Sequence, residues 1–84
     1  MNEPKPWVTR VKHIELIHKN HLRENSKWTI DNTAKELHIA KGGVSESLLL
    51  AKYMKTHPKV ELFTTVQDAL EYCRKLKRLE RMGV

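Results

Sequence analysis

The sequence predicts an all-α fold, a small helix-turn-helix bundle of four to five helices, and three observations predict it. Apolar residues recur at three- and four-residue spacing in several segments, which is the pattern of amphipathic helices. No segment shows the alternating pattern of a β-strand. The 84 residues are enough for one hydrophobic core and too few for a second. We therefore expect residues 1–84 to form a single domain.

The first helix is predicted from Val8 to about Asn25. Before it, residues 1–6 contain two prolines and little to bury, so we expect a flexible arm that ends at Trp7, with Trp7 docked on the core. A stripe of residues at helical spacing then faces inward, and its members are Val11, Ile14, Ile17, His18 and Leu22. One buried stripe of this kind is typical of an amphipathic helix.

Residues 29–55 predict two short helices joined by a tight turn. Thr29 is a good N-cap for the first, which we expect to end at about Leu37 because His38 follows. The second is predicted from Lys41 to Lys55. The inward positions are Ala34, Leu37, Ile39, Val44 and Leu48, and the outward positions include Lys35, Lys41, Ser45 and Glu46. A helix-turn-helix needs this arrangement to present one helix end to the major groove of DNA.

The last helix is predicted over residues 65–82, preceded by at most one helical turn between Pro58 and Phe63. Thr64 or Thr65 can cap it. Its apolar stripe is expected to cover the second helix of the pair, and consists of Val66, Leu70, Cys73, Leu76 and Leu79. Cys73 is the only cysteine, so no disulfide can form within the chain, and we expect a small buried thiol. The end of this helix, RKLKRLER, is strongly basic.

The formal net charge of +6 favours partners that carry phosphate. Ribosomes, membranes and acidic proteins attract such a chain as well, and the helix-turn-helix pattern is what favours nucleic acid. We expect no enzyme, metal or cofactor, because His13, His18 and His21 lack a fourth ligand and no catalytic motif is present. No apolar run would span a membrane and no signal-peptide pattern is seen, so we expect a cytoplasmic protein of a bacterial cell or a phage-infected host.

Residues 28–58 also resemble a known group of DNA-binding modules. The segment TAKELHIAKGGVSESLLLAKYM is similar to the helix-turn-helix of the ParB and KorB partition proteins and of related small phage and plasmid proteins. The chain departs from that pattern at His38, where the turn usually has glycine, and at Ser47, where an apolar residue is usual. It also has no room for the other domains of full partition proteins. The resemblance therefore implies DNA binding by the module and does not imply chromosome segregation.

Carried over position by position, the resemblance assigns base contacts to Lys41, Ser45 and Glu46. Lys41 would bind guanine O6 or N7, and Glu46 would accept from cytosine N4, with a plain surface charge as the alternative for Glu46. Gly42 and Gly43 would let backbone N–H groups approach a phosphate, or are merely tolerated at a frayed helix start. Further phosphate contacts are expected from Thr29, Thr33, Lys35, Arg74, Lys75, Lys77 and Arg78, with Arg81 as an auxiliary. A solvated helix end is the alternative for the basic C-terminal residues.

The sequence thus favours a sequence-specific protein that binds double-stranded DNA, as a small transcriptional regulator or DNA-maintenance accessory factor of phage or plasmid origin. One recognition helix gives weak specificity, so we expect a homodimer through the C-terminal helix or a protein partner. The first alternative is a protein-interaction module for a host or viral protein, which the double glycine and Glu46 favour. The second is a small terminase-type packaging subunit that binds DNA as a ring. RNA is disfavoured because no exposed aromatic pair for base stacking is evident.

Overall fold

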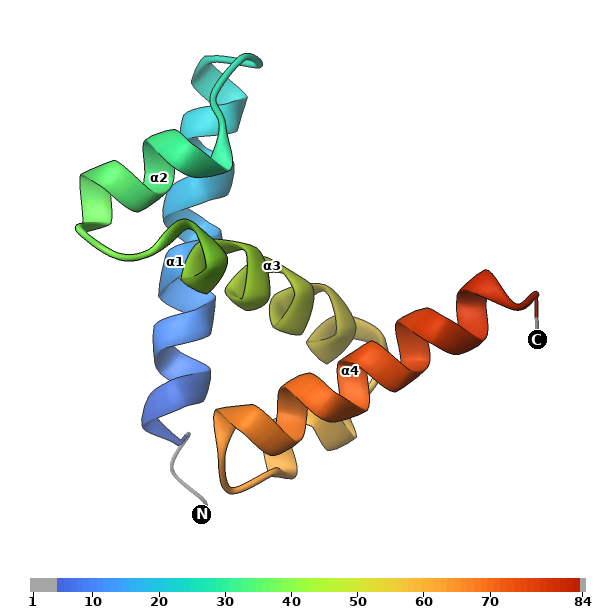
Figure 1. The fold of residues 1–84 in the computed structure, drawn as a ribbon. Coiled ribbons are helices and arrows are strands. Elements are labelled where there is room, and N and C mark those ends of the chain that lie inside the picture. The colour runs from blue at the N-terminus through green and yellow to red at the C-terminus, as the bar shows by residue number, and fades with distance from the viewer. Residues whose placement is uncertain (1–4, 84) are drawn as a thin grey trace.

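Helices follow one another along the whole described chain (Figure 1). The structure, a computed structural model, describes residues 5–83. Its elements are α1 (Pro6–Glu24), α2 (Ile30–Leu37), α3 (Lys41–Thr56), the short 3₁₀ helix η1 (Pro58–Leu62) and α4 (Val66–Arg81). No strand occurs between residues 5 and 83. The predicted all-α bundle of four to five helices is confirmed.

The start of α1 lies earlier than predicted, at Pro6. Proline suits the first turn of a helix because its φ angle is already helical and the N–H that it lacks would have no partner there. Residues 1–4 of the expected arm lie outside the described residues. Of the remaining arm residues, Lys5 is the N-cap of α1 and Pro6 is its first residue, so these two belong to the helix start and not to a flexible arm. Trp7 docks as expected, since its Nε1 donates to the carbonyl oxygen of Phe63 at 3.1 Å.

The other helix ends lie where local sequence signals predicted them. Thr29 caps α2 by accepting a hydrogen bond from the Asn32 N–H, and Thr65 caps α4 by accepting from the Asp68 N–H, both at 3.2 Å. His38 ends α2 in the left-handed conformation, with φ of 56°. That conformation is uncommon for residues other than glycine, and histidine is among those that tolerate it best. The turn therefore forms without the glycine that is usual there.

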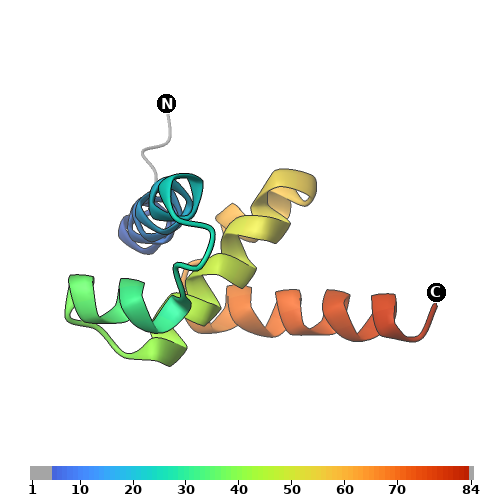
Figure 2. The ribbon, with the colours of Figure 1, turned by 90° about the horizontal axis from the view of Figure 1, so that it is seen from above.

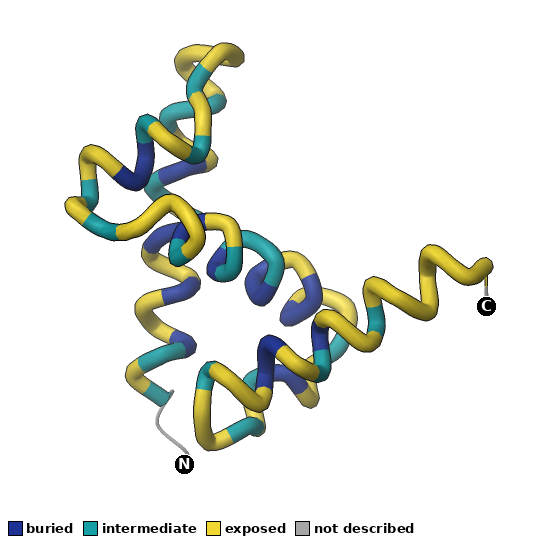
Figure 3. Tube along the Cα trace, viewed as in Figure 1, coloured by how far each residue is buried: buried dark blue, intermediate teal, exposed yellow. Residues whose placement is uncertain are grey.

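The apolar core consists of two clusters, and α1 and α3 contribute to both. The smaller one holds α2, through Ile14, Ala34 and Val44. The larger one joins α1, α3, η1 and α4 and contains Val8, Val11, Leu50, Ala51, Tyr53, Met54, Val60, Ala69, Leu70 and Cys73. Figure 3 shows the buried stretches along the sides of α1, α3 and α4 that face one another. α3 is thus the central helix of the fold, covered by different neighbours along its length.

The C-terminal part of α4 extends beyond the core (Figures 1 and 2). The predicted stripe covers α3 as far as Leu76, which packs against the larger cluster. Leu79 is 47% exposed, so its predicted place in the core was wrong, because α4 has by then passed its neighbours. Tyr53 still ties this region to α3 by donating its hydroxyl hydrogen to Glu80 Oε2 at 2.7 Å. The radius of gyration of 13.5 Å exceeds the about 12 Å of a fully compact chain of this length, in agreement with the projecting helix.

Replacing Val44 with aspartate should abolish cooperative unfolding. Val44 is fully buried between α2 and α1, so the new carboxylate would lie without a partner in an apolar cluster. Such burial costs several kcal/mol, a large share of the stability of a small domain. Thermal denaturation followed by circular dichroism would measure the effect. Ser45→Asp, at the exposed next residue, is the matched control and should melt cooperatively; a normal melt for Val44→Asp would contradict the helix placement.

Candidate nucleic-acid interface

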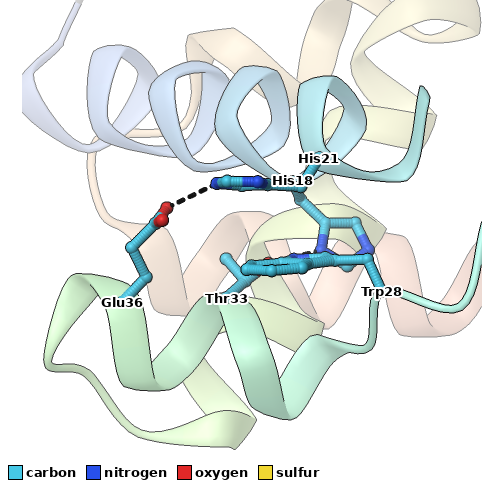
Figure 4. A network of polar contacts seen from close by, with 5 residues as sticks. All are labelled: His18, His21, Trp28, Thr33 and Glu36. Carbon is cyan, nitrogen blue, oxygen red and sulfur yellow. Dashed lines mark hydrogen bonds and ion pairs between the residues drawn. The ribbon is translucent and has the colours of Figure 1, made fainter. Parts of the chain in front are cut away.

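A buried polar network fixes α2 against α1 (Figure 4). Thr33 on α2 is fully buried, and its Oγ1 accepts a hydrogen bond from Trp28 Nε1 at 2.7 Å. The same hydroxyl lies 2.7 Å from Nδ1 of His18 on α1. Because an indole only donates, the Thr33 hydroxyl keeps its own hydrogen to donate to a neutral His18 ring. The hydroxyl is thereby satisfied in both directions, and its burial leaves no unpaired group.

A second pair of side chains carries this network to the surface. The His21 ring stacks on Trp28, with centroids 3.9 Å apart and planes 12° from parallel. Its Nε2 lies 2.8 Å from Glu36 Oε2. His18 and His21 are three residues apart on α1, and Thr33 and Glu36 are three apart on α2, so each pair shares one helix face. Two contacts about one turn apart therefore fix both the position and the rotation of α2.

The predicted phosphate contact of Thr33 was wrong. Its side chain is 0% exposed and its hydroxyl serves the network, so it cannot meet a phosphate at the surface. Thr29 remains exposed, and its hydroxyl accepts one bond as the cap of α2 while keeping a hydrogen to donate. Lys35 is also exposed and lies 3.4 Å from Asp31, one turn earlier on the same helix. An exposed pair of this kind contributes about 0.3–0.5 kcal/mol, so a phosphate can compete for the lysine.

The start of α3 is open to solvent and has no side-chain cap. Its N-cap residue is Ala40, which has no side-chain group that could accept a hydrogen bond. The N-caps of α2 and α4, by contrast, are Thr29 and Thr65, whose hydroxyls do accept one. A Cβ atom added at Gly42 or Gly43 would meet nothing within 4 Å, and neither glycine has a positive φ angle. The fold itself therefore does not require glycine at either position. The Gly43 N–H donates to the Ala40 carbonyl oxygen at 3.0 Å, whereas the N–H groups of Lys41 and Gly42 have no partner within the helix, so this end can receive an anion.

Two of the three predicted base-contacting residues point freely outward at the start of α3. Lys41 and Ser45 are exposed. Glu46 is half-buried, and its Oε2 lies 3.0 Å from a guanidinium nitrogen of Arg74 on α4. An ion pair whose side chains are 44% and 54% exposed contributes at most about 1 kcal/mol. Glu46 is thus a charge with an intramolecular partner, and it can contact a base only after leaving Arg74.

The basic residues of α4 fall into two groups on different sides of the helix. Arg74 and Lys77 line a hollow beside α3. Arg78 and Arg81 follow them at four-residue spacing and continue the same side. Lys75 lines a different hollow, with Asp68 and Glu71 among its neighbours. The structure therefore brings Arg74 and Lys77 to the outer face of α3 and separates Lys75 from them.

The hollow beside α3 includes a lysine that sequence reasoning missed. It has a volume of about 460 Å³ and is lined by Ile30, Ser45, Glu46, Leu48, Leu49, Lys52, Arg74 and Lys77. Lys52 lies seven residues after Ser45 and eleven after Lys41, which places all three on one helix face. The helical spacing of these three residues could have identified Lys52 from the sequence alone. Among residues 5–83, Lys41, Lys52 and Lys77 form no ion pair within 4.0 Å, so their charges are available to a ligand.

The remaining candidates for chemistry are placed as structural or surface groups. Cys73 is fully buried, as expected, and burial raises the pKa of its thiol. His13 is exposed, and the described part of the chain has no cluster of three or more His, Cys, Asp or Glu side chains that could hold a metal ion. None of the helices α1 to α4 has the length and apolar character to cross a membrane.

Comparisons of the chain with protein-family models, curated proteins and solved structures found no match. A functional conclusion therefore depends on the residues and their geometry. The features that the structure brings together on one surface are the open start of α3, the unpaired lysines along the outer face of that helix, and the Arg74 side of α4.

Lowering the pH should destabilise the fold through His18. Burial, and then the nearby His21 charge, lower the pKa of His18 below its ordinary value of 6.5. In the unfolded chain the imidazole titrates near 6.5, so the unfolded state binds more protons just below that pH. The contribution of His18 to the free energy of unfolding is complete above pH 6.5 and is lost progressively as the pH falls toward the folded-state pKa. Urea unfolding at about pH 7.5 and about pH 5.5 would measure this loss.

The variant His18→Gln tests whether this residue is the cause. The glutamine cannot titrate, so the difference in unfolding free energy between the two pH values should shrink. His13→Gln, on the exposed side of the same helix, is the matched control and should keep the wild-type difference. If His18→Gln and the wild type lose equal stability on acidification, other groups are responsible.

Proposed function

We propose that this chain binds double-stranded DNA through the start and outer face of α3. The observation that carries the proposal is the uncapped start of α3, where exposed Lys41 is followed by exposed Gly42 and half-buried Gly43, and an added Cβ at either glycine would meet nothing within 4 Å. An α-helix fits the major groove, and a helix end with free N–H groups and adjacent cations suits the phosphate backbone. In this arrangement Lys41 and Ser45 contact base edges, while Gly42 and Gly43 allow close approach of the backbone.

The glycines support the proposal because they reduce the stability of the helix, and neither packing nor backbone conformation within the protein requires them. Each costs up to about 1 kcal/mol relative to alanine within a helix. The space that their side chains would fill is empty, and their φ angles are ordinary. A group from outside the protein that approaches the helix end closely, such as a phosphate, accounts for the missing side chains.

The cations around α3 extend the proposed contact to the DNA backbone. Lys52 and Lys77 line the hollow beside α3, and Arg74 joins them if it exchanges Glu46 for a phosphate. Such contacts set the position and orientation of a protein on the duplex without reading sequence. Lys75 faces a different hollow and has no part in this surface.

The role that best fits this surface is that of a small sequence-specific regulator or DNA-maintenance accessory factor. The resemblance of residues 28–58 to the helix-turn-helix of partition proteins supports a phage or plasmid origin. Such a protein would act in the cytoplasm of a bacterial cell. Its base contacts are few, so a second DNA-binding unit or a protein partner would complete its specificity.

Fluorescence anisotropy with random and genomic pools of double-stranded DNA tests the proposal directly. At about 50 mM salt we expect binding, and at about 200 mM salt a marked loss of affinity as counterions compete. If about five cations contact phosphates, log K should fall with log salt at a slope of roughly −5. Selection of a discrete site from the genomic pool would establish sequence-specific recognition. Absence of binding at the lower salt concentration would overturn the proposal.

A protein-interaction module on the same scaffold is the second candidate function. The Glu46–Arg74 ion pair favours it, because a carboxylate on the proposed recognition helix repels phosphates and its pairing occupies a cation. In that case the outer face of α3 would bind a protein, and DNA of any sequence would bind weakly. The anisotropy experiment separates the two functions.

Gly42→Ala and Gly43→Ala should each strengthen the fold and weaken DNA binding. Alanine at either position gains up to about 1 kcal/mol of helix stability, since its methyl group meets no other atom. The same methyl group would hold a phosphate away from the backbone. Urea unfolding and DNA anisotropy on the same samples would show the two opposite effects. Gln67→Ala, at an exposed position of α4, is the control, because it raises helix propensity away from the proposed DNA surface. If both glycine variants are more stable and bind DNA with unchanged affinity, a phosphate does not approach the backbone closely at these positions.

Lys41→Ala should weaken binding to a selected DNA site by about 1–3 kcal/mol. Lys41 is exposed and forms no ion pair within the described chain, so its removal leaves the fold intact. Competition anisotropy with sites altered at single base pairs would also detect relaxed specificity at one position. Lys59→Ala, on η1 at the opposite end of α3, removes the same charge and should have a much smaller effect. Equal effects of the two variants would mean that Lys41 contributes only general charge.

A further inference from the structure

We propose that a second groove, between α1 and the C-terminal half of α3, binds an acidic amphipathic helix of a partner protein. The groove has a volume of about 430 Å³, within the range of ligand-binding clefts. Its apolar floor consists of Leu16 from α1 and Ala51 and Met54 from α3. Leu16 is 59% exposed, and nothing in the described chain covers it. Leu16 therefore provides the exposed part of this floor, whereas Ala51 and Met54 are only 2% and 7% exposed.

The rim of the groove carries the charge that selects its partner. It has four cations, Lys12, Lys19, Arg23 and Lys55, and two carboxylates, Glu15 and Glu61. Each carboxylate already has a lysine partner within the groove: Glu15 lies 3.2 Å from Lys19 and 3.1 Å from Lys55, and Glu61 lies 3.1 Å from Lys12. The rim therefore has a net positive charge, and both of its negative groups are neutralised.

Glu15 holds the lysines of the two helices together at the groove. Its side chain is only 17% exposed. Partial burial raises the pKa of Glu15, but the hydrogen bonds from Lys55 and Lys19 lower it by more, so the net shift is downward. The carboxylate is thus ionised at neutral pH and fixes one lysine from each side of the groove. The positive rim is organised before any partner arrives.

An acidic amphipathic helix matches both features of this surface. Apolar side chains at three- and four-residue spacing would enter the groove between α1 and α3, and flanking carboxylates would meet the cations of the rim. Leu16 would supply most of the apolar contact, because Met54 belongs to the core and is only 7% exposed. A nucleic-acid strand would satisfy the cations and leave Leu16 in water, so the apolar floor favours a peptide.

This groove and the proposed DNA surface lie on different sides of the molecule. In Figure 2, α1 and the end of α3 lie on one side, and α2 and α4 lie on the other. On α3 itself, Met54 follows Lys52 by two residues, which turns it about 200° around the helix axis. A partner helix in the groove therefore leaves the start of α3 accessible. Docking of the peptide does not depend on DNA binding, and either proposal can fail without the other.

A pair of synthetic peptides provides the test. The first is a fluorescein-labelled helix of about 14 residues with leucines at three- and four-residue spacing and glutamates on its flanks. The second has the same composition in an order that scatters the leucines around the helix. We expect the first to bind the full chain about tenfold more tightly, because only its leucines can enter the groove together. Equal binding would mean that charge alone attracts the peptides and would overturn the proposal.

Substitutions then locate the peptide on the protein. Leu16→Ser should weaken binding of the amphipathic peptide about tenfold, as expected for loss of one buried leucine contact. Leu79→Ser is the matched control, since Leu79 is also exposed but lies on α4 outside the groove. This variant should bind the peptide with the same affinity as the wild type. Unchanged affinity in Leu16→Ser would overturn the proposal. Arg23→Gln, which removes a charge from the rim and no apolar contact, should weaken binding less and in a salt-dependent manner.

Discussion

The buried hydroxyl of Thr33 is the constraint on which the placement of α2 and α3 depends. α2 has only eight residues, of which Thr33 and Ala34 are buried while Ile30 and Leu37 pack partly buried against the smaller cluster, so a helix this short needs support beyond its own turns. A buried hydroxyl needs partners, and these come from His18 on α1 and from Trp28 in the segment before α2. α2 therefore has one favourable position on α1. The direction of α3 follows, because Ala34 and Val44 share a cluster with Ile14.

Local sequence signals predicted most of the fold. The apolar periodicity of α1 and α4 and the Thr29 and Thr65 caps each depend on residues within one or two helical turns. The helix bounds follow from them to within about two residues, which is the usual uncertainty of a helix end. The start of α1 at Pro6, two residues before the predicted Val8, differs most, because proline is compatible both with an extended arm and with the first turn of a helix.

The features that sequence reasoning missed depend on how the helices pack. Thr33 looks like an exposed first-turn residue until its partner His18, fifteen residues away, is known. Glu46 and Arg74 are 28 residues apart, so their ion pair has no local signal. The exposure of Leu79 depends on where α4 passes the end of its neighbours. Each of these could be predicted only after the arrangement of helices α1 to α4 was known.

The start of α3 combines a weak local helix with a firm anchor, and this combination suits a surface that must meet a ligand. Gly42, Gly43 and the lack of a capping side chain all reduce the stability of the first turn. Directly after them, Val44 is fully buried, and Ser47 donates its hydroxyl hydrogen to the Gly43 carbonyl oxygen at 2.8 Å. The first turn therefore has weaker local support than the rest of the helix, which the core fixes. A bound anion would supply the missing partners of the N–H groups, so binding at this end would also stabilise the helix.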